Sequence, residues 1–234
     1  MRLDRFLSNL PRFNRQDARH LLASGGVRLD GRVNRDGRSE VTLFSRVELG
    51  DGEILQAGKP ARYFMLHKPG GVVSATVHPE HRTVLDLLDE PDKDELHLAG
   101  RLDLNTSGLL LITNDGQWSR RVTLPKRKQP KVYLVETEDP IEPACIEVFA
   151  RGLYFRFEDL TTLPAELEIL APRQARLTLY EGRYHQVKRM FGHFQNKVIG
   201  LHRISMGAIR LDAGLGPGEY RALTSAEIDS FSRN

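Results

Sequence analysis

Hydrophobic residues near the N-terminus recur at the spacing of two short helices followed by a hairpin. The first helix is predicted by apolar residues at i, i+3, i+4 and i+7, which are Leu3, Phe6, Leu7 and Leu10. Asn14 and Asp17 are the N-cap and N3 residues of a second predicted helix, which Gly25-Gly26 ends. Apolar residues then alternate around Asp30-Gly31, a dipeptide typical of two-residue hairpins. The alternating residues are Val27, Leu29 and Val33.

Beyond about residue 60 the pattern changes to strands separated by turns. Glycine and proline punctuate residues 56–61, where we place a linker, so the predicted domains are residues 1–58 and 59–234. A return strand is predicted to start at Val72-Val73, after a turn at residues 69–71. The other predicted strands are residues 63–67, 109–112, 132–137, 165–170 and 175–180.

Helices are fewer in this second region. One is predicted at residues 144–150, and another follows a strand that ends at Gly182. The buried stripe of the latter is Val187, Met190 and Phe191, at helical spacing. Strands and helices do not alternate regularly, so a parallel βαβ sheet is not expected, and the pattern favours an α+β fold with a mainly antiparallel sheet.

Composition indicates an ordinary soluble protein. Hydrophobic residues make up 40% and charged residues 28% of 234 positions, which is typical of a globular chain that can bury a core. Cys145 is the only cysteine, so an intrachain disulfide is impossible and a reducing compartment is expected. The charged N-terminus has no signal-peptide core, and no apolar run approaches the length of a membrane span. We therefore expect a cytoplasmic protein with no membrane partner.

The positive charge of the chain is concentrated at its N-terminus. Residues 1–38 contain nine arginines and four aspartates, a net charge of +5, whereas the whole chain carries +3. The rest of the chain is therefore slightly acidic. Such a local basic excess is typical of a nucleic-acid-binding module, and a solvated arginine-rich surface is the alternative.

Two short helices followed by a basic hairpin resemble the S4 domain, a small RNA-binding module. The resemblance rests on Arg2-Leu3-Asp4-Arg5-Phe6-Leu7, on Asn14-Arg15 and on residues 27–33, and it covers about residues 1–48. It implies that arginines on the polar sides of the helices and beside the hairpin turn contact RNA. These are Arg2, Arg5, Arg15, Arg19, Arg28 and Arg32.

Residues 100–116, Gly-Arg-Leu-Asp-Leu-Asn-Thr-Ser-Gly-Leu-Leu-Leu-Ile-Thr-Asn-Asp-Gly, form the most informative segment. One carboxylate, Asp103, lies in a turn-rich loop that runs into a buried strand, which Asn114-Asp115-Gly116 closes with a turn signal. Taken alone, an aspartate in a loop is usually a turn or cap residue. The whole segment resembles the catalytic motif of the pseudouridine synthases, and within them the RsuA type that modifies ribosomal RNA. The resemblance implies that Asp103 is catalytic.

Two further segments resemble the same family in the same order. His67-Lys68-Pro69-Gly70-Gly71-Val72-Val73-Ser74 is similar to a strand and turn that support the cleft, and we assign it no chemistry. Lys131-Val132-Tyr133-Leu134-Val135 is an alternating strand in which the family's tyrosine faces the uracil ring. A tyrosine in a strand is usually a core residue, so the functional role of Tyr133 rests on the resemblance.

The last matching segment is residues 181–191, Glu-Gly-Arg-Tyr-His-Gln-Val-Lys-Arg-Met-Phe. In the family a cation here pairs with the catalytic aspartate, and the match places it at Lys188, on the flank of the apolar stripe. Arg189 is the alternative for this pairing and is also a candidate RNA contact; two solvated basic residues are the other interpretation. Arg101, beside Asp103, is implied to touch RNA.

The implied reaction converts uridine to pseudouridine: the N1–C1′ bond breaks, the base turns, and C5 joins C1′. Nothing is oxidised and no group is gained, so we expect no cofactor and no metal. Asp103 can act at C1′, at C6 or on the C2′ proton, and the sequence leaves these open. A nearby cation keeps the carboxylate charged, and the Tyr133 ring can hold the detached uracil. The target must leave its stack to react.

A metal site is considered at His78-Pro79-Glu80-His81. The two imidazoles lack the helical i, i+4 spacing of paired zinc ligands, and no third ligand is apparent. The segment is therefore predicted to be a surface loop, with no bound metal.

The family resemblance covers almost the whole chain, including residues 215–224. It implies an α+β protein: a small N-terminal S4-like RNA-binding domain and a pseudouridine synthase catalytic domain with a mainly antiparallel mixed sheet and a central cleft. Residues 115–119 and 184–190 are most similar to members acting on 16S ribosomal RNA, at uridine 516, and a 23S substrate remains open. The expected partner is ribosomal RNA in an assembling small subunit, and the expected state is a monomer.

Two other classes of function are weighed. A non-catalytic ribosome-assembly protein could keep the fold, but it would have no reason to retain Asp103, Tyr133 and Lys188 together. A glycoside-cleaving enzyme also uses an attacking carboxylate, but it normally needs two carboxylates flanking the bond. No second carboxylate is expected to accompany Asp103.

Overall fold

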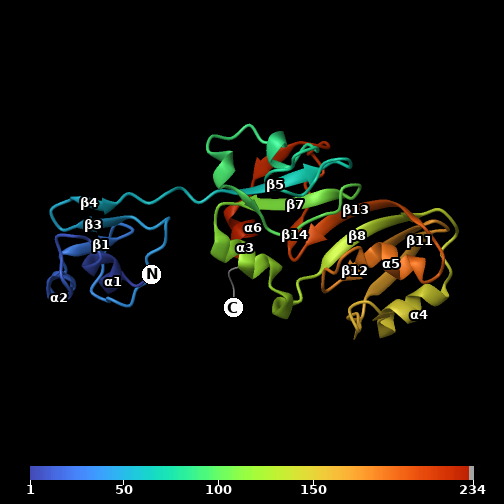
Figure 1. The fold of residues 1–234 in the computed structure, drawn as a ribbon, viewed down its shortest axis with the longest axis horizontal. Coiled ribbons are helices and arrows are strands. Elements are labelled where there is room, and N and C mark those ends of the chain that lie inside the picture. Colours follow the sequence, from blue (N-terminus) through green and yellow to red (C-terminus); the bar gives the residue numbers. More distant parts are fainter. Residues whose placement is uncertain (232–234) are drawn as a thin grey trace. The chain divides into compact units, whose positions relative to one another are not determined.

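The described residues separate into two units, each with its own core. The computed structural model describes residues 1–231 (Figure 1). Along the chain, the first unit ends at Ala61 and the second begins at Arg62. The sequence places this boundary after residue 58, three residues earlier.

The N-terminal unit packs two helices on a four-stranded antiparallel sheet of order β2-β1-β3-β4. Its elements are α1 (Leu3–Ser8), α2 (Arg15–Ser24), β1 (Val27–Leu29), β2 (Arg32–Val33), β3 (Val47–Leu49) and β4 (Ile54–Gln56). Asn14 and Asp17 form the predicted capping box, and Gly25 ends α2 with a φ of 77°. The buried residues of the two helices form the core together with Val27 and Val47 of the sheet. These helical residues are Leu3, Leu7, Ala18 and Leu22. The predicted alternation fails at Val33, which is 48% exposed because β2 is a short edge strand.

The second unit is built on a mixed sheet in which, among the described residues, only the β13–β7 pair is parallel. In sheet order the strands are β11 (Glu166–Ala171), β12 (Gln174–Leu179), β8 (Lys131–Thr137), β13 (Val198–Met206), β7 (Ser107–Thr113), β5 (Tyr63–Lys68) and β15 (Tyr220–Ala222). Beside them lie β14 (Ile209–Arg210) on β13 and β6 (His97–Leu98) on β7. The predicted α+β class with a mainly antiparallel mixed sheet is confirmed.

Helices and a small hairpin complete this unit. The helices are α3 (Gly116–Thr123), α4 (Ala144–Arg151), α5 (Gln186–Gly192) and α6 (Ser225–Asp229), and single 3₁₀ turns lie at Leu85–Leu87, Lys93–Glu95 and Pro125–Arg127. The hairpin is β9 (Tyr154–Phe155) and β10 (Leu160–Thr161).

Strand β7 is buried on both faces, which explains its unbroken apolar sequence. Leu109 and Leu111 pack in one core with Trp118 of α3, whereas Leu110 and Ile112 belong to a second core on the opposite face. A strand enclosed in this way gives the loop before it, residues 99–106, a rigid attachment.

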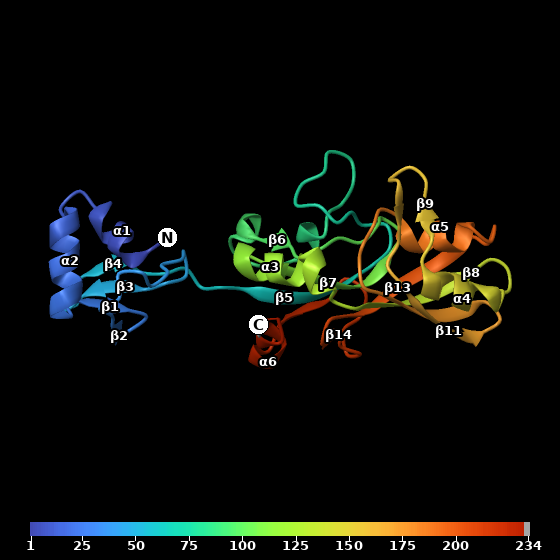
Figure 2. The same cartoon turned by 90° about the horizontal axis from the view of Figure 1, so that it is seen from below.

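Helix α5 packs against the other half of the sheet, near α4 (Figure 2). Its predicted stripe, Val187, Met190 and Phe191, is buried, and the Phe191 ring meets Phe149 of α4 at a centroid distance of 5.2 Å. Because this stripe fixes the rotation of α5, it also fixes the direction of Lys188.

Two local predictions are wrong. Val72-Val73 starts no strand, since β5 already has β7 and β15 as neighbours, and Val72 is buried in a core instead. The strand predicted to reach Gly182 ends at Leu179. The predicted turn signal at residues 114–116 follows the end of β7 at Thr113, and there the Asp115 side chain accepts from the N–H groups of Gln117 and Trp118 and caps α3.

Candidate active site

Asp103 lies in the loop between β6 and β7, and hydrogen bonds anchor that loop at several points. The Ser74 hydroxyl donates to the Leu102 carbonyl at 2.7 Å and accepts from the Leu102 N–H at 3.1 Å. The Thr106 N–H donates to the Asp103 carbonyl at 3.0 Å, which closes a turn around the aspartate. The backbone that carries the carboxylate is therefore held in place.

Lys68 is buried beneath the same loop. Its Nζ donates to three carbonyl oxygens, those of Pro69 at 2.9 Å, Leu104 at 3.1 Å and Thr106 at 2.8 Å. Burial lowers the pKa of this ammonium to about 8, and the charge of Asp103 partly offsets the effect. Segment 67–74 thus supports the cleft through a side chain whose contacts the sequence does not reveal.

Gly108 lets β7 approach β13 immediately after the loop. Its φ is +105°, and a Cβ added there would lie 2.3 Å from the backbone oxygen of Arg203. Only glycine fits both the conformation and the contact. This close approach places the Asp103 loop next to strands β13 and β8, which form the floor of a cavity.

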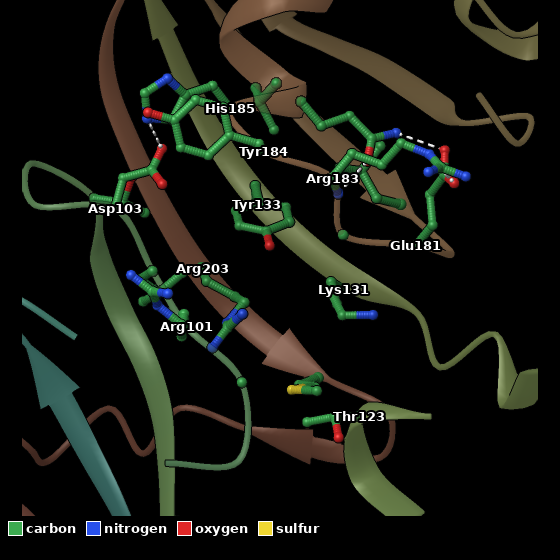
Figure 3. A pocket seen from close by; sticks show the side chains of 18 of the residues that line it. Arg101, Asp103, Thr123, Lys131, Tyr133, Glu181, Arg183, Tyr184, His185 and Arg203 are labelled. Atoms are coloured by element: carbon green, nitrogen blue, oxygen red, sulfur yellow. Dashed lines mark hydrogen bonds and ion pairs between the residues drawn. The ribbon is translucent and has the colours of Figure 1, made fainter. Parts of the chain in front are cut away.

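Two cationic or ionisable side chains of the α5 segment, Lys188 and His185, face the Asp103 carboxylate, and Figure 3 shows the His185 contact. Lys188 Nζ lies 3.8 Å and His185 Nε2 lies 3.6 Å from Asp103 Oδ2. The Asp103 side chain is 31% exposed, so solvent screens these interactions only in part. The structure thus brings Lys188 beside Asp103.

His185 is a neighbour of Asp103 that the sequence reasoning missed. It precedes α5 with a φ of +49°, in the left-handed region, and its ring stacks on Tyr184 at a centroid distance of 3.8 Å. Tyr184 is itself 74% exposed at the mouth of the site. The sequence feature that could have identified His185 is the run Tyr-His-Gln at the start of the helix. This run places an imidazole within one turn of Lys188.

Tyr133 lies on the floor of the site. It comes from β8, opposite Leu177 of β12 and Arg203 of β13, and it is 8% exposed. Its ring lines the same cavity as Asp103 and Lys188, and the cavity volume is about 860 Å³. That volume is typical of a ligand site. Arg101 is exposed and also lines this cavity.

Arg189 is engaged elsewhere. Its guanidinium donates to both carboxylate oxygens of Glu158, at 2.5 and 2.7 Å, and it lies 3.6 Å above the Phe155 ring. Among the described residues its ion pair is with Glu158 and not with Asp103. The alternative of Arg189 as the partner of Asp103 is therefore wrong in this structure, because the β9–β10 hairpin occupies its guanidinium.

A second carboxylate, Glu181, also lines the cavity, contrary to expectation. It pairs with Arg183 at 2.9 Å and accepts from the Leu163 N–H and the Gln186 side chain. Since these donors occupy both oxygens, Glu181 holds the start of α5 in place and is not a free second carboxylate.

The arginines of the N-terminal unit lie on its surface, as their helical and hairpin positions predict. Arg15 and Arg19, four residues apart on α2, share one face of that helix. Arg2 is partly engaged, because its Nε donates to Asp4 at 3.1 Å. Arg28 donates weakly to Gly31 beside the turn that separates it from Arg32. Arg5 is exposed on α1.

The segment with two histidines is a loop with local bonds. His78 Nδ1 accepts from the N–H groups of Glu80 and His81, and the two imidazoles stack at 4.8 Å. Within residues 1–231 no group of three or more histidine, cysteine or acidic side chains gathers to hold a metal ion. Over the same residues no helix has the length and apolarity to cross a membrane.

Comparisons with known proteins agree with this geometry. A model of the RNA pseudouridylate synthase family matches residues 62–193, which include the cavity residues Asp103, Tyr133 and Lys188. A solved structure described as pseudouridylate synthase superposes with a TM-score of 0.71 at 41% identity, covering 99% of both chains.

Similar curated proteins extend over nearly the full length. The ribosomal small subunit pseudouridine synthase A of Pseudomonas aeruginosa is 64% identical over 98% of this chain and 100% of its own. The proteins of that name from Vibrio cholerae and Escherichia coli K12 are 50% and 46% identical, over 99% and 98% of this chain and 99% of their own chains. The chain therefore belongs to the RNA pseudouridylate synthase family and, within it, to the RsuA type that its motifs predicted.

Proposed function

We propose that this protein isomerises one uridine of 16S ribosomal RNA to pseudouridine. The observation that carries the proposal is the Asp103 carboxylate beside Lys188 Nζ, at 3.8 Å, in one cavity with Tyr133. The printed names of the similar proteins favour a small-subunit substrate. Uridine 516 is the proposed site.

Asp103 is the proposed catalytic carboxylate. It acts on the target nucleotide at C1′, at C6 or on the C2′ proton, and each route ends with the N1–C1′ bond broken and a C5–C1′ bond formed. The proton that leaves C5 is balanced by the proton gained at N1. No oxidant, reductant or added group enters this balance.

Lys188 supplies a positive charge next to Asp103, and His185 places an imidazole nitrogen at a similar distance. Entry of a nucleotide removes water from the cavity, and desolvation alone favours the protonated carboxylic acid. The Lys188 ammonium, 3.8 Å from Asp103 Oδ2, gives the carboxylate a cationic partner in place of the lost water. Lys188 is therefore proposed to be the partner of Asp103 in the reaction.

Tyr133 is proposed to face the uracil ring. Tyr133 lines the cavity, its aromatic face can hold the base while the base turns, and its hydroxyl can take part in removing the C5 proton. Neither C1′ nor C5 is accessible in a stacked helix, so the target nucleotide must be extruded into the cavity. Arg101, exposed beside Asp103, is placed to contact the RNA that remains.

The N-terminal unit is proposed to bind RNA as an S4-like domain. Its exposed arginines offer charge that can pair with phosphates. These are Arg2, Arg5, Arg15, Arg19, Arg28 and Arg32. We further propose that the protein acts as a monomer in the cytoplasm, on an assembling small ribosomal subunit, where shape and loop exposure select the target.

The test is pseudouridine mapping of ribosomal RNA from cells that lack this protein. The cells are complemented with the wild type, with Asp103→Asn or with Asp94→Asn, an exposed aspartate of the same unit. We expect loss of one 16S site, restored by wild type and Asp94→Asn and not by Asp103→Asn. Loss of a 23S site instead would support the same reaction on 23S ribosomal RNA. If no site changes, a non-catalytic role in ribosome assembly replaces the proposal.

A further inference from the structure

One end of the cavity holds cations that the chemistry at Asp103 does not use. Figure 3 shows Arg203 and Lys131 on the side of Tyr133 away from Tyr184. In the sheet, Arg203 is the register partner of Tyr133 across β13 and β8, and Lys131 precedes Tyr133 by two residues. Paired residues and residues two apart share a face, so all three side chains emerge on the cavity side of the sheet.

Arg203 is a buried guanidinium with an unused donor. The residue is 2% exposed, its Nε donates to the Leu109 carbonyl at 2.8 Å, and its Nη2 has no hydrogen-bond partner in the described chain. A buried charged donor without an acceptor is costly, and native proteins rarely retain one without a reason. The Arg203 side chain lines the cavity, so a small rotation of the buried guanidinium toward an acceptor in the cavity would relieve this cost.

Lys131 adds a second charge next to the first. Its Nζ donates to the Gln129 carbonyl at 3.1 Å, and burial together with the positive charge of Arg203 lowers its pKa. Glu181 offsets this only in part, since its oxygens already accept from Arg183, Gln186 and the Leu163 N–H. Among residues 1–231 neither Arg203 nor Lys131 forms an ion pair, so this end of the cavity keeps a positive potential.

We propose that Arg203 and Lys131 form a subsite for an RNA phosphodiester adjacent to the target uridine. The inference rests on the proposed function, which places the base at Tyr133 and the sugar at Asp103. The anion of the substrate closest to both is a flanking phosphate. One phosphodiester carries a single charge with acceptor oxygens, which suits a guanidinium donor and an ammonium on the same face.

The test combines a side-chain change with a change in the RNA. Lys131→Met removes the charge and keeps the apolar stem, Lys131→Arg keeps the charge, and Lys93→Met is a control at a lysine in the 3₁₀ turn Lys93–Glu95. Binding is measured with RNA fragments in which one phosphate is replaced by an uncharged methylphosphonate, at each position around the target. Thermal melting confirms that each variant is folded.

For the wild type, we expect the Kd to rise about tenfold when one phosphate flanking the target is replaced, and much less at other positions. Lys131→Met should weaken binding of unmodified RNA by a similar factor and respond little to the same replacement. Its log Kd should also depend less steeply on log salt, by about 0.7 in slope. Lys131→Arg and Lys93→Met should behave as wild type.

Equal sensitivity of wild type and Lys131→Met to every methylphosphonate would overturn the subsite. So would a uniform response of the wild type at all positions, because a general basic surface gives that result. These outcomes are read from binding, so they are independent of turnover. A wild type that forms no pseudouridine overturns the proposed function instead.

Discussion

The two units of this protein use positive charge in opposite ways. In the N-terminal unit, Arg5, Arg15 and Arg32 are exposed, and the described residues give none of them an ion-pair partner. In the second unit, Lys68 and Arg203 are buried, and backbone carbonyls hold both. Exposed charges act through a screened, additive attraction, whereas a buried charge fixes geometry around it. Changes in the first unit should therefore alter RNA binding, and changes in the second should alter turnover.

The largest effect should come from Asp103. Asp103→Asn removes the ionised carboxylate but keeps its shape, so we expect kcat to fall by about 10⁴-fold or more while RNA affinity stays within a few fold. Single-turnover assays and a binding titration separate the two. A kcat within tenfold of wild type would show that Asp103 is not catalytic. It would also contradict the expectation that changes in the second unit alter turnover.

The next effect should separate two neighbouring cations of α5. Lys188→Met should lower kcat by about 10²-fold, because Asp103 loses its partner at 3.8 Å, and Lys188→Arg should restore part of it. Arg189→Met should leave kcat nearly unchanged, since its partner is Glu158. Kinetics of the three variants on one RNA provide the measurement. The reverse order of effects would make Arg189 the functional cation.

A smaller loss of turnover is expected from Lys68, whose Nζ donates only to backbone carbonyls. Lys68→Met leaves the Thr106 carbonyl without its donor and the Leu104 carbonyl with only the Gly71 N–H, at 2.9 Å, and the displaced loop should cost about tenfold in kcat. The melting temperature shows whether the fold survives. An unchanged kcat in a folded variant would mean that the hydrogen bonds of Ser74, Gly71 and Thr106 position the loop without Lys68.

Lys68 also predicts a pH dependence of stability. Its pKa falls from its usual 10.5 to about 8 on folding, so between these values the unfolded chain binds more protons. The free energy of unfolding therefore gains a positive contribution as pH rises from about 8 to 10, and the cost of burying the charge is fully present below 8. Denaturant unfolding at several pH values should show this slope in wild type and lose it in Lys68→Met.

The smallest effect per residue should come from the N-terminal unit. Replacing Arg15 and Arg19 by glutamine should raise the Kd for RNA several fold at low salt, with kcat at saturation unchanged. The difference should shrink as salt increases, because both charges are exposed. A salt-independent difference, or a lower kcat, would show that this unit does more than attract RNA.

The two units also differ in how far their sequence could be interpreted. In the N-terminal unit the cap at Asn14, the turn at Asp30-Gly31 and the stop at Gly25 are all found where predicted, because each depends on residues within a few positions. In the second unit the strand β13 was not predicted, although it pairs with both β7 and β8. Its sequence, Val-Ile-Gly-Leu-His-Arg-Ile-Ser-Met, mixes apolar residues with a histidine and a buried arginine.

The sequence by itself determined the family, the α+β class, the loop that carries Asp103 and the helical stripe that directs Lys188. The family follows from the resemblance of the motifs to those of the pseudouridine synthases, and the other features follow from residue types at short spacing, where backbone propensity and periodicity decide. The tertiary structure alone showed that Lys68 reaches carbonyls 36 and 38 residues away, that Arg203 reaches one 94 residues away, and that Glu181 enters the cavity already bonded. Such contacts depend on which strands become neighbours and which groups share the buried space between them, and no local pattern encodes either.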